Sequence, residues 1–235
     1  MFANRSVRAS LAVVMLMGPA LGLAQQQPHE IKLTPFVGVY APTTKVAKMD
    51  MTVEGTSFAA SITQKTSFAF GATGSYWWTR RVGLELGGAY AMSDATGTFR
   101  TAGGAFDPSA MSQSERARVL FGSARLMFGI LPLGEDAQLR LGMGPAIVNR
   151  GGKAYRAEAD GKFQGLTDVG GVVSLCTRIP MTELLAIRIR AEDYMYESQL
   201  KVRTIGGDAS GTFAFDRRFQ HDFLVSAGLQ LGFRR

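Results

Sequence analysis

FQHDFLVSAGLQLGF, residues Phe219 to Phe233, alternates between two kinds of side chain along its whole length. One face consists of Phe219, His221, Phe223, Val225, Ala227, Leu229, Leu231 and Phe233, and the other carries Gln220, Asp222, Ser226 and Gln230. Strict alternation of this kind predicts a β-strand, because successive side chains point to opposite faces. The strand exceeds the usual length of about 5–6 residues and reaches the roughly 9–11 of a membrane strand. Since hydrocarbon does not tolerate open sheet edges, the stretch predicts a closed barrel.

The composition agrees with one all-β domain. The chain has 235 residues, a mean hydropathy of +0.05, and no apolar run near the roughly 18 residues of a membrane helix. Its 28 glycines and 15 phenylalanines fit closely packed strands and aromatic belts. A single cysteine, Cys176, excludes an internal disulfide and a thiolate metal cluster. No metal and no cofactor are predicted.

The chain divides into three segments. Residues 1–24 predict a cleaved secretory signal, with Arg5 and Arg8, a short apolar core from Leu11 to Met17, and small residues before Gln25. Residues 25–30 form a polar N-terminal lead, and residues 31–235 form the barrel domain. The formal net charge of +7 is spread along the chain. Nucleic-acid binding requires a basic stripe, so it is not expected.

Seven further segments share the alternating pattern of the last strand. They are Ile31 to Tyr40, Ser67 to Trp78, Val82 to Tyr90, Val119 to Ile130, Leu139 to Val148, Leu166 to Arg178 and Leu185 to Tyr196. The connections between them are long and short in turn. Bacterial transmembrane barrels have even strand counts, short periplasmic turns and longer outer loops. We therefore predict a closed, antiparallel, up-and-down transmembrane β-barrel of eight strands.

Two local features of the sequence bear on this arrangement. Pro35 cannot donate to a strand ladder, so it must lie at a bulge or an unpaired site. The first loop, Ala41 to about Thr66, contains two weak alternations, Met49 to Val53 and Phe58 to Ile62. They predict either a hairpin above the membrane or an extra strand pair, which would make ten strands.

Charged side chains within the strands test the proposed lipid face. If the apolar face meets lipid, strand charges must occupy the other face, because an Arg or Lys facing lipid at the midplane costs about 2–4 kcal/mol. Arg178 and Asp222 also fall on the face opposite the apolar one, whereas Asp193 falls on the apolar face and is the exception. We predict a lumen charge network that consists of Lys32, Glu85, Arg125, Arg140, Asp168, Arg188, Arg190 and Glu192.

Aromatic residues gather near both ends of the predicted strands, as they do at the two membrane interfaces. The predicted girdles consist of Tyr40, Phe70, Trp77, Trp78, Tyr90, Phe128, Phe223 and Phe233. A soluble, lipocalin-like barrel is the alternative. In such a barrel the numerous Phe and Leu side chains would have to fit inside.

Several motifs resemble the small outer-membrane β-barrels, a family similar to the OmpA membrane domain, OmpX and OmpW. They are LTPFVGVYAP (33–42), WWTRRVGLELGGAY (77–90), IRIRAEDYMY (187–196) and SAGLQLGF (226–233). The resemblance implies an outer-membrane location and an assembly signal at Gly228, Leu229, Leu231 and Phe233, read by the barrel-assembly machinery. Arg234 and Arg235 after Phe233 depart from the family pattern, and no peptidoglycan-binding domain follows.

The lumen residues lead to three functional hypotheses. An eight-stranded barrel is just wide enough for side chains to fill, so the first is a non-enzymatic, structural or surface-interaction protein with a charge-plugged lumen. The second is a narrow, OmpW-like conduit for small or hydrophobic solutes. The third, a lipid-modifying enzyme, is disfavoured because His221 and Ser226 fall on opposite faces. Expected partners are outer-membrane lipid and lipopolysaccharide, with the loop-binding partner unknown and the chain monomeric.

Overall fold

The computed structural model describes residues 29–53, 56–102, 109–133, 137–155, 161–164, 166–204 and 212–233. The predicted signal and most of the polar lead therefore lie outside the described residues. The strands are β1 Glu30–Pro42, β2 Ala47–Val53, β3 Thr56–Gln64, β4 Ser67–Trp77, β5 Val82–Ala102, β6 Ser109–Leu133, β7 Ala137–Gly152, β8 Gly161–Gln164, β9 Thr167–Pro180, β10 Leu185–Ser198, β11 Lys201–Thr204, β12 Thr212–Ala214 and β13 Arg218–Phe233, and one short 3-10 helix, η1, spans Lys153–Tyr155.

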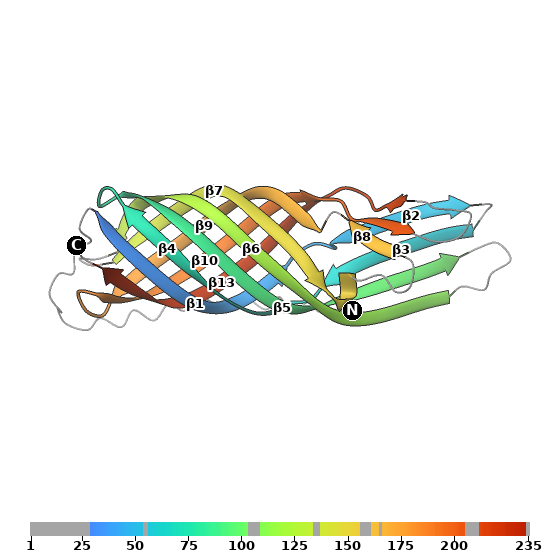
Figure 1. The fold of residues 1–235 in the computed structure, drawn as a ribbon, viewed down its shortest axis with the longest axis horizontal. Helices are drawn as coiled ribbons and strands as arrows, with labels where there is room; N and C mark the ends of the chain where they lie inside the picture. The colour runs from blue at the N-terminus through green and yellow to red at the C-terminus, as the bar shows by residue number, and fades with distance from the viewer. Residues whose placement is uncertain are drawn as a thin grey trace, which may run out of the picture.

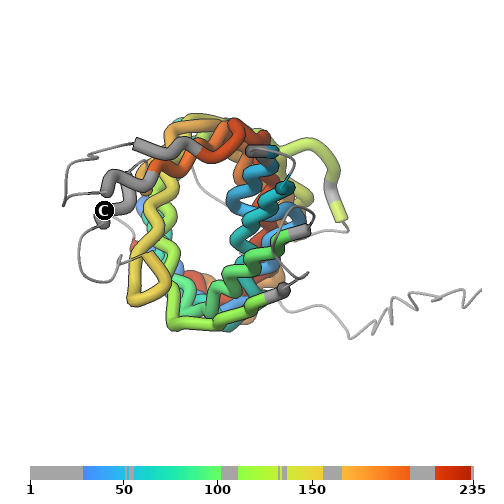
Figure 2. The backbone as a smooth tube through the Cα atoms, turned by 90° about the vertical axis from the view of Figure 1, so that its right-hand side faces the viewer, coloured from blue at the N-terminus to red at the C-terminus, as the bar shows by residue number. Residues whose placement is uncertain are grey.

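Eight of these strands form a closed antiparallel ring in the order β5-β4-β1-β13-β10-β9-β7-β6, and β6 pairs with β5 to complete it. Figures 1 and 2 show this barrel from the side and along its length. The predicted fold class and the count of eight strands are confirmed. The C-terminal strand β13, which has the longest alternating pattern, pairs with β1 on one side and β10 on the other.

The two ends of the barrel differ, as the alternation of long and short connections predicts. The ends of β4 and β9 meet the starts of β5 and β10 through residues 78–81 and 181–184, and β6 ends beside the start of β7 at the same end, which we call the short-turn end. The other end, the long-loop end, carries the longer connections. Pro35 lies opposite Ala72 of β4, and the register between β1 and β13 has no partner for it, so the unpaired site expected for this proline is present.

Two strands extend much further than the sequence pattern predicts. Residues 91–117 were expected to form a loop, but β5 continues to Ala102 and β6 begins at Ser109, and the two remain paired from Val82↔Phe128 to Thr101↔Ser109. The ladder continues because backbone hydrogen bonds do not depend on an apolar face. Outside a bilayer the outer half of this hairpin needs no apolar alternation, so the sequence signal disappears while the strands continue.

The first loop forms a hairpin. β2 pairs with β3, and β3 joins the outer half of β5 from Gln64↔Ala95 to Ser57↔Ala102, beyond the point where β4 ends. The pair is therefore an addition to the long-loop end and not part of the ring, which decides between the two alternatives (Figure 1). Further along the chain, β8, β11 and β12 form a separate three-stranded sheet within residues that were expected to be loops.

Removing the β2–β3 hairpin should leave the ring intact. Ala47 and Ile62 are register partners, so a two-residue Asn-Gly turn can replace residues 48–61 without moving either end. We expect the free energy of unfolding in detergent micelles to change by about 1 kcal/mol or less. Urea titration and heat-modifiable electrophoretic mobility measure this. Failure of the shortened chain to form a heat-modifiable barrel would contradict the separation of hairpin and ring.

Side-chain burial alternates residue by residue along the ring strands, and the inward and outward positions are those that the sequence predicts. On β1 the apolar side chains of Ile31, Leu33, Val37 and Val39 are exposed on the outside, whereas Lys32, Thr34, Phe36 and Tyr40 are buried inside. A sheet that puts its apolar residues outward and its ionisable residues inward has the inverse pattern of a soluble barrel. The lipocalin-like alternative is therefore wrong. None of the described helices is long and apolar enough to span a membrane.

Candidate functional site: the filled lumen

A group of five buried charged residues crosses the middle of the barrel. We call Glu85, Glu192, Arg125, Arg188 and Arg190 the central ion network, and each is at most 3% exposed. The Glu85 carboxylate accepts hydrogen bonds from Arg188 and from Arg190 (3.0 Å) and forms an ion pair with Arg125 (3.0 Å). Charges buried this deeply require partners, because the desolvation cost of each ion is several kcal/mol.

The central ion network joins opposite walls of the ring. Glu85 lies on β5 and Arg188 and Arg190 lie on β10, and three strands separate β5 from β10 in either direction round the ring. The second carboxylate, Glu192 of β10, pairs with Arg125 of β6 and with Arg190 (3.3 Å). Ion pairs between opposite walls mean that these side chains occupy the centre of the lumen at this level.

Closer to the short-turn end, a buried aromatic ring, that of Trp77, contacts the inward-facing Arg140. The Trp77 side chain is fully buried, and the Arg140 guanidinium lies over its ring at 4.5 Å from the centroid, a cation–π contact. Trp77 also packs with Met127 and Cys176, and the Cys176 thiol accepts a hydrogen bond from Arg188 (3.1 Å). Cys176 therefore has a structural role as a small lumen residue beside the central ion network.

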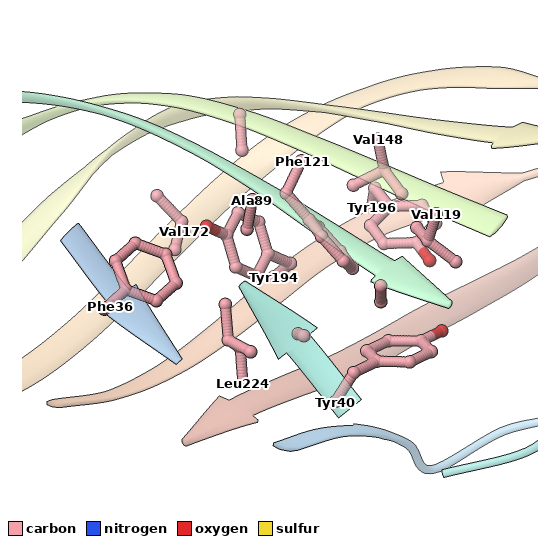
Figure 3. Packing of buried hydrophobic residues seen from close by; sticks show 13 residues of the cluster. Phe36, Tyr40, Ala89, Val119, Phe121, Val148, Val172, Tyr194, Tyr196 and Leu224 are labelled. Carbon is pink, nitrogen blue, oxygen red and sulfur yellow. The ribbon is translucent and has the colours of Figure 1, made fainter. Parts of the chain in front are cut away.

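Further towards the long-loop end, apolar side chains fill the lumen. The cluster contains Phe36, Tyr40, Ala69, Ala89, Ala91, Val119, Phe121, Ala146, Val148, Val172, Tyr194, Tyr196 and Leu224, which we call the aromatic layer. Figure 3 shows its larger side chains pointing towards one another from several strands. Phe121 lies between Tyr194, at 4.6 Å between ring centroids, and Tyr40, at 5.5 Å. Such aromatic pairs add about 0.5–1.5 kcal/mol beyond area burial.

A second ion cluster lies beyond the aromatic layer. The Arg150 guanidinium donates a hydrogen bond to the Asp168 carboxylate (2.7 Å) and another to the Tyr196 hydroxyl, and it lies 3.6 Å from the Asp222 carboxylate. Tyr196 in turn donates to Asp222. We call Arg150, Asp168, Tyr196 and Asp222 the outer ion network. Each of these contacts joins side chains of two different strands, so β7, β9, β10 and β13 are linked here.

Above the outer ion network, η1 brings Tyr155 across the mouth of the barrel. Its hydroxyl donates a hydrogen bond to the Gln64 side chain of β3 (3.4 Å), and its ring packs with Val46 and Leu200. Burial disfavours the phenolate and raises the pKa of Tyr155 to about 12. Tyr155 is therefore neutral at physiological pH and acts as a hydrogen-bond donor at the rim.

The eight residues proposed for the lumen network are all buried within the barrel, but they do not form one network. Five of them make the central ion network. Lys32 pairs instead with Glu30 (2.9 Å), and Arg140 stacks on Trp77. Asp168 pairs with Arg150, a residue that sequence reasoning placed in a loop and therefore missed. Arg150 lies two residues after the inward-facing Val148, so continuing the alternation of β7 by one more inward position would have identified it.

Two assignments to the aromatic girdles are wrong. Tyr40 and Trp77 are both fully buried and point into the lumen. The reason is the pleat, since Val39 and Trp78 take the outward positions and their chain neighbours must face inward. The other six, Phe70, Trp78, Tyr90, Phe128, Phe223 and Phe233, lie on the outer surface. Leu229, Leu231 and Phe233 also point outward from β13, and their part in assembly stays a prediction.

Asp193 lies on the outer surface, as its parity predicts, and it has a partner. Its carboxylate is 2.9 Å from the Nδ1 atom of His221 on the adjacent strand β13. The Thr43 hydroxyl donates a hydrogen bond to the backbone carbonyl of His221. In the described part of the chain, the His221 ring contacts the Asp193 carboxylate and the Phe219 ring. Within the described ranges, no group of three or more His, Cys, Asp or Glu residues could hold a metal ion.

Comparison with known proteins rests on structure alone. No protein-family model matches the sequence, and no curated protein matches it. The solved structure of the outer membrane protein OprG from Pseudomonas aeruginosa is similar, with a TM-score of 0.61 and 12% identity over 89% of this chain and 99% of that chain. The outer membrane protein AlkL, solved in lipid bilayers, has a TM-score of 0.57 and 11% identity over 93% of this chain and 96% of that chain. These likenesses show that the chain has the fold of a small outer-membrane β-barrel.

Proposed function

We propose that this protein is a non-enzymatic outer-membrane barrel whose lumen is closed by its own side chains and which presents a β-rich surface to the exterior. The observation that carries the proposal is the central ion network, in which Glu85 of β5 is bonded to Arg188 and Arg190 of the opposite strand β10. A water-filled pore requires the centre of the lumen to be free of side chains. Here it holds five charged groups that neutralise one another in part.

Membrane placement is supported by the outer surface of the ring. Large apolar side chains cover it on every ring strand, among them Leu33, Phe70, Leu86, Leu126 and Leu229. Monomeric soluble proteins rarely expose contiguous apolar patches beyond a few hundred Å². A bilayer would cover the outward apolar side chains with hydrocarbon, and the inward charged side chains form ion pairs within the lumen. The structural likeness to two outer-membrane proteins supports the same location.

A surface role is supported by the strands beyond the ring. β5 and β6 continue past the ring as a long hairpin, and β3 and β2 add to its edge. Paired strands give these regions a fixed shape, which suits recognition better than an unstructured loop. Binding residues concentrate on connections that a rigid scaffold positions. The closed barrel would serve as that scaffold, with the barrel-assembly machinery as its partner during insertion.

The aromatic layer favours a second candidate, a narrow conduit for small apolar solutes. Its contiguous apolar side chains line the lumen between the two ion networks, and the sequence resemblance to OmpW implies such a path. In this alternative the solute would enter at the long-loop end and displace side chains such as Phe121 and Leu224. It could not pass the central ion network without breaking the ion pairs of Glu85.

Planar-bilayer conductance of the purified protein distinguishes a closed barrel from a pore. We expect no stable, large open state, because the central ion network blocks the lumen. A general porin in the same bilayers is the positive control for insertion. Release of a small apolar dye from proteoliposomes tests the conduit in parallel. A stable large conductance would contradict the closed barrel, and dye release without conductance would favour the conduit.

A further inference from the structure

An open groove of about 1110 Å³ lies at the long-loop end across β4, β5, β6 and β7. Its lining includes outward side chains of these strands, among them Phe68 and Met92, which are 52% and 55% exposed. It also includes the buried residues Ser93, Ala117, Arg150 and Tyr155. The inward residues of the opposite wall, such as Tyr40 and Asp222, do not line it. The exposed side chains of the lining therefore form an outer-surface part of the groove, and the buried ones border it.

The groove has an apolar part and a cationic part. Phe68, Tyr90 and Met92 make the apolar part, and the Phe70 and Tyr90 rings are in contact beside it, with centroids 5.5 Å apart. Lys65, Arg116, Arg118 and Lys153 make the cationic part, and all four side chains are exposed. The only acidic residue of the lining is Asp94, opposite Arg116 on the paired strand.

The boundary between these parts coincides with the end of the apolar belt. Along β6 the outward positions pass from Phe128 and Leu126 to Leu120, and then to Arg118 and Arg116. Along β5, Tyr90 is paired with Leu120, and Met92 with Arg118. Aromatic residues mark the interface of a bilayer, so the next outward residues lie at the depth of the lipid head groups. Two arginines follow the apolar belt directly on β6.

None of Lys65, Arg116, Arg118 and Lys153 forms an ion pair among the described residues, although Asp94 is the register partner of Arg116. Lys65 donates a hydrogen bond to the Ser114 hydroxyl (3.4 Å). On the opposite flank, Asp193 pairs with His221 and Glu197 pairs with Arg217. The flank that carries the groove therefore has exposed cations that form no ion pair.

Glycine leaves room for the Arg118 side chain. Gly151 of β7 is the register partner of Arg118, and a Cβ atom at residue 151 would lie 2.9 Å from the Arg118 Nε atom. Arg118 thus lies across a glycine and close to the surface of the sheet. Its planar guanidinium can donate two parallel hydrogen bonds to a phosphate.

We propose that this groove binds a phosphorylated glycolipid of the outer leaflet, of the lipid A type, with acyl chains along Phe68, Tyr90 and Met92 and phosphate against Arg116 and Arg118. The inference rests on the membrane placement proposed above and assigns that lipid a specific site. Its chemistry requires an occupant with both an apolar body and an anionic head, which excludes free phosphate and neutral phospholipid as the preferred ligand.

Native mass spectrometry of the full chain in detergent micelles tests the proposal, with bisphosphorylated lipid A and the same lipid A after enzymatic removal of its phosphates as probes. We expect the phosphorylated form to bind at least tenfold more tightly. Replacement of both arginines (Arg116→Gln, Arg118→Gln) should weaken that binding about 30-fold, since each basic side chain near an anionic head group contributes about a fivefold factor. High salt should reduce the difference between the two forms of lipid A.

Two double variants serve as controls. Arg80→Gln with Arg81→Gln removes the same charge from the short-turn end, and Lys201→Gln with Arg217→Gln removes it from the long-loop end outside the groove. Both should bind phosphorylated lipid A within twofold of the wild-type chain. Equal loss in a control variant, equal binding of the two forms of lipid A, or unchanged binding by the arginine variant would overturn the proposal.

A third variant guards against misfolding of the arginine variant. Met92→Glu places a carboxylate at an exposed position beside Arg118 and should also weaken binding of phosphorylated lipid A at least tenfold. Heat-modifiable mobility checks the fold of each variant. Conductance separates this inference from the closed lumen, because all of these side chains lie outside the barrel. Normal lipid binding with an open pore would reject only the closed lumen, and a closed pore without selective lipid binding would reject only the groove.

Discussion

Glu85→Gln should destabilise the barrel by about 3–5 kcal/mol, because it removes the carboxylate shared by three buried arginines. Glu192 would then be the remaining carboxylate of the central ion network, and it bonds to Arg125 and Arg190. Arg188 would keep its hydrogen bond to the Cys176 thiol and lose its ion pair. The cost is the desolvation of a guanidinium that no longer has a counter-ion.

Urea unfolding in micelles, followed by tryptophan fluorescence, measures the effect. Glu197→Gln is the matched control, because Glu197 lies on β10 with an exposed ion pair to Arg217 that should contribute about 1 kcal/mol or less. A double-mutant cycle with Arg188→Met isolates the interaction between Glu85 and Arg188. Equal effects of Glu85→Gln and Glu197→Gln would show that the central ion network does not stabilise the lumen.

Phe121→Ala should cost about 3–5 kcal/mol through the cavity that it leaves in the aromatic layer. The Phe121 ring contacts both Tyr40 and Tyr194, which come from different strands, so neither ring can fill the space without leaving its own contacts. The backbone of a closed barrel cannot collapse inward, because each strand is held by two neighbours. The cavity therefore persists.

Leu120→Ala is the control for this change. Leu120 is the chain neighbour of Phe121, but its side chain points outward and is 42% exposed. We expect a loss of about 1 kcal/mol or less in the free energy of unfolding. The same urea titration compares the two variants. If Leu120→Ala proves as costly as Phe121→Ala, the aromatic layer is not the packed core of the barrel.

Much of this architecture follows from parity in the sequence. A strand has a period of two, so one outward apolar residue fixes the side of every neighbour on that strand. This is why the sequence alone assigns Glu85, Arg125, Arg188 and Glu192 to the lumen. The same rule, applied strictly, would have placed Tyr40 and Trp77 inside as well.

The alternation of side chains shows whether a residue faces the lumen or the outside, but not its height along the barrel axis. Which inward charges meet depends on the register between strands and on the closure of the ring, both of which are tertiary properties. Asp168 therefore could not be matched to Arg150 from sequence. The extensions of β5 and β6 were also missed, because beyond the apolar belt large apolar residues are sparse and the alternation that marks a strand is lost.

The sequence by itself determined a closed barrel with apolar residues outside and charges inside, because only this arrangement satisfies both sets of side chains, and it left eight or ten strands open. Only the tertiary structure decided that the lumen contains two separate ion networks with an aromatic layer between them. It also brought four cations from three separate segments of the chain into one groove on the outer surface. Both outcomes depend on the relative shift of neighbouring strands, for which a single strand carries no signal.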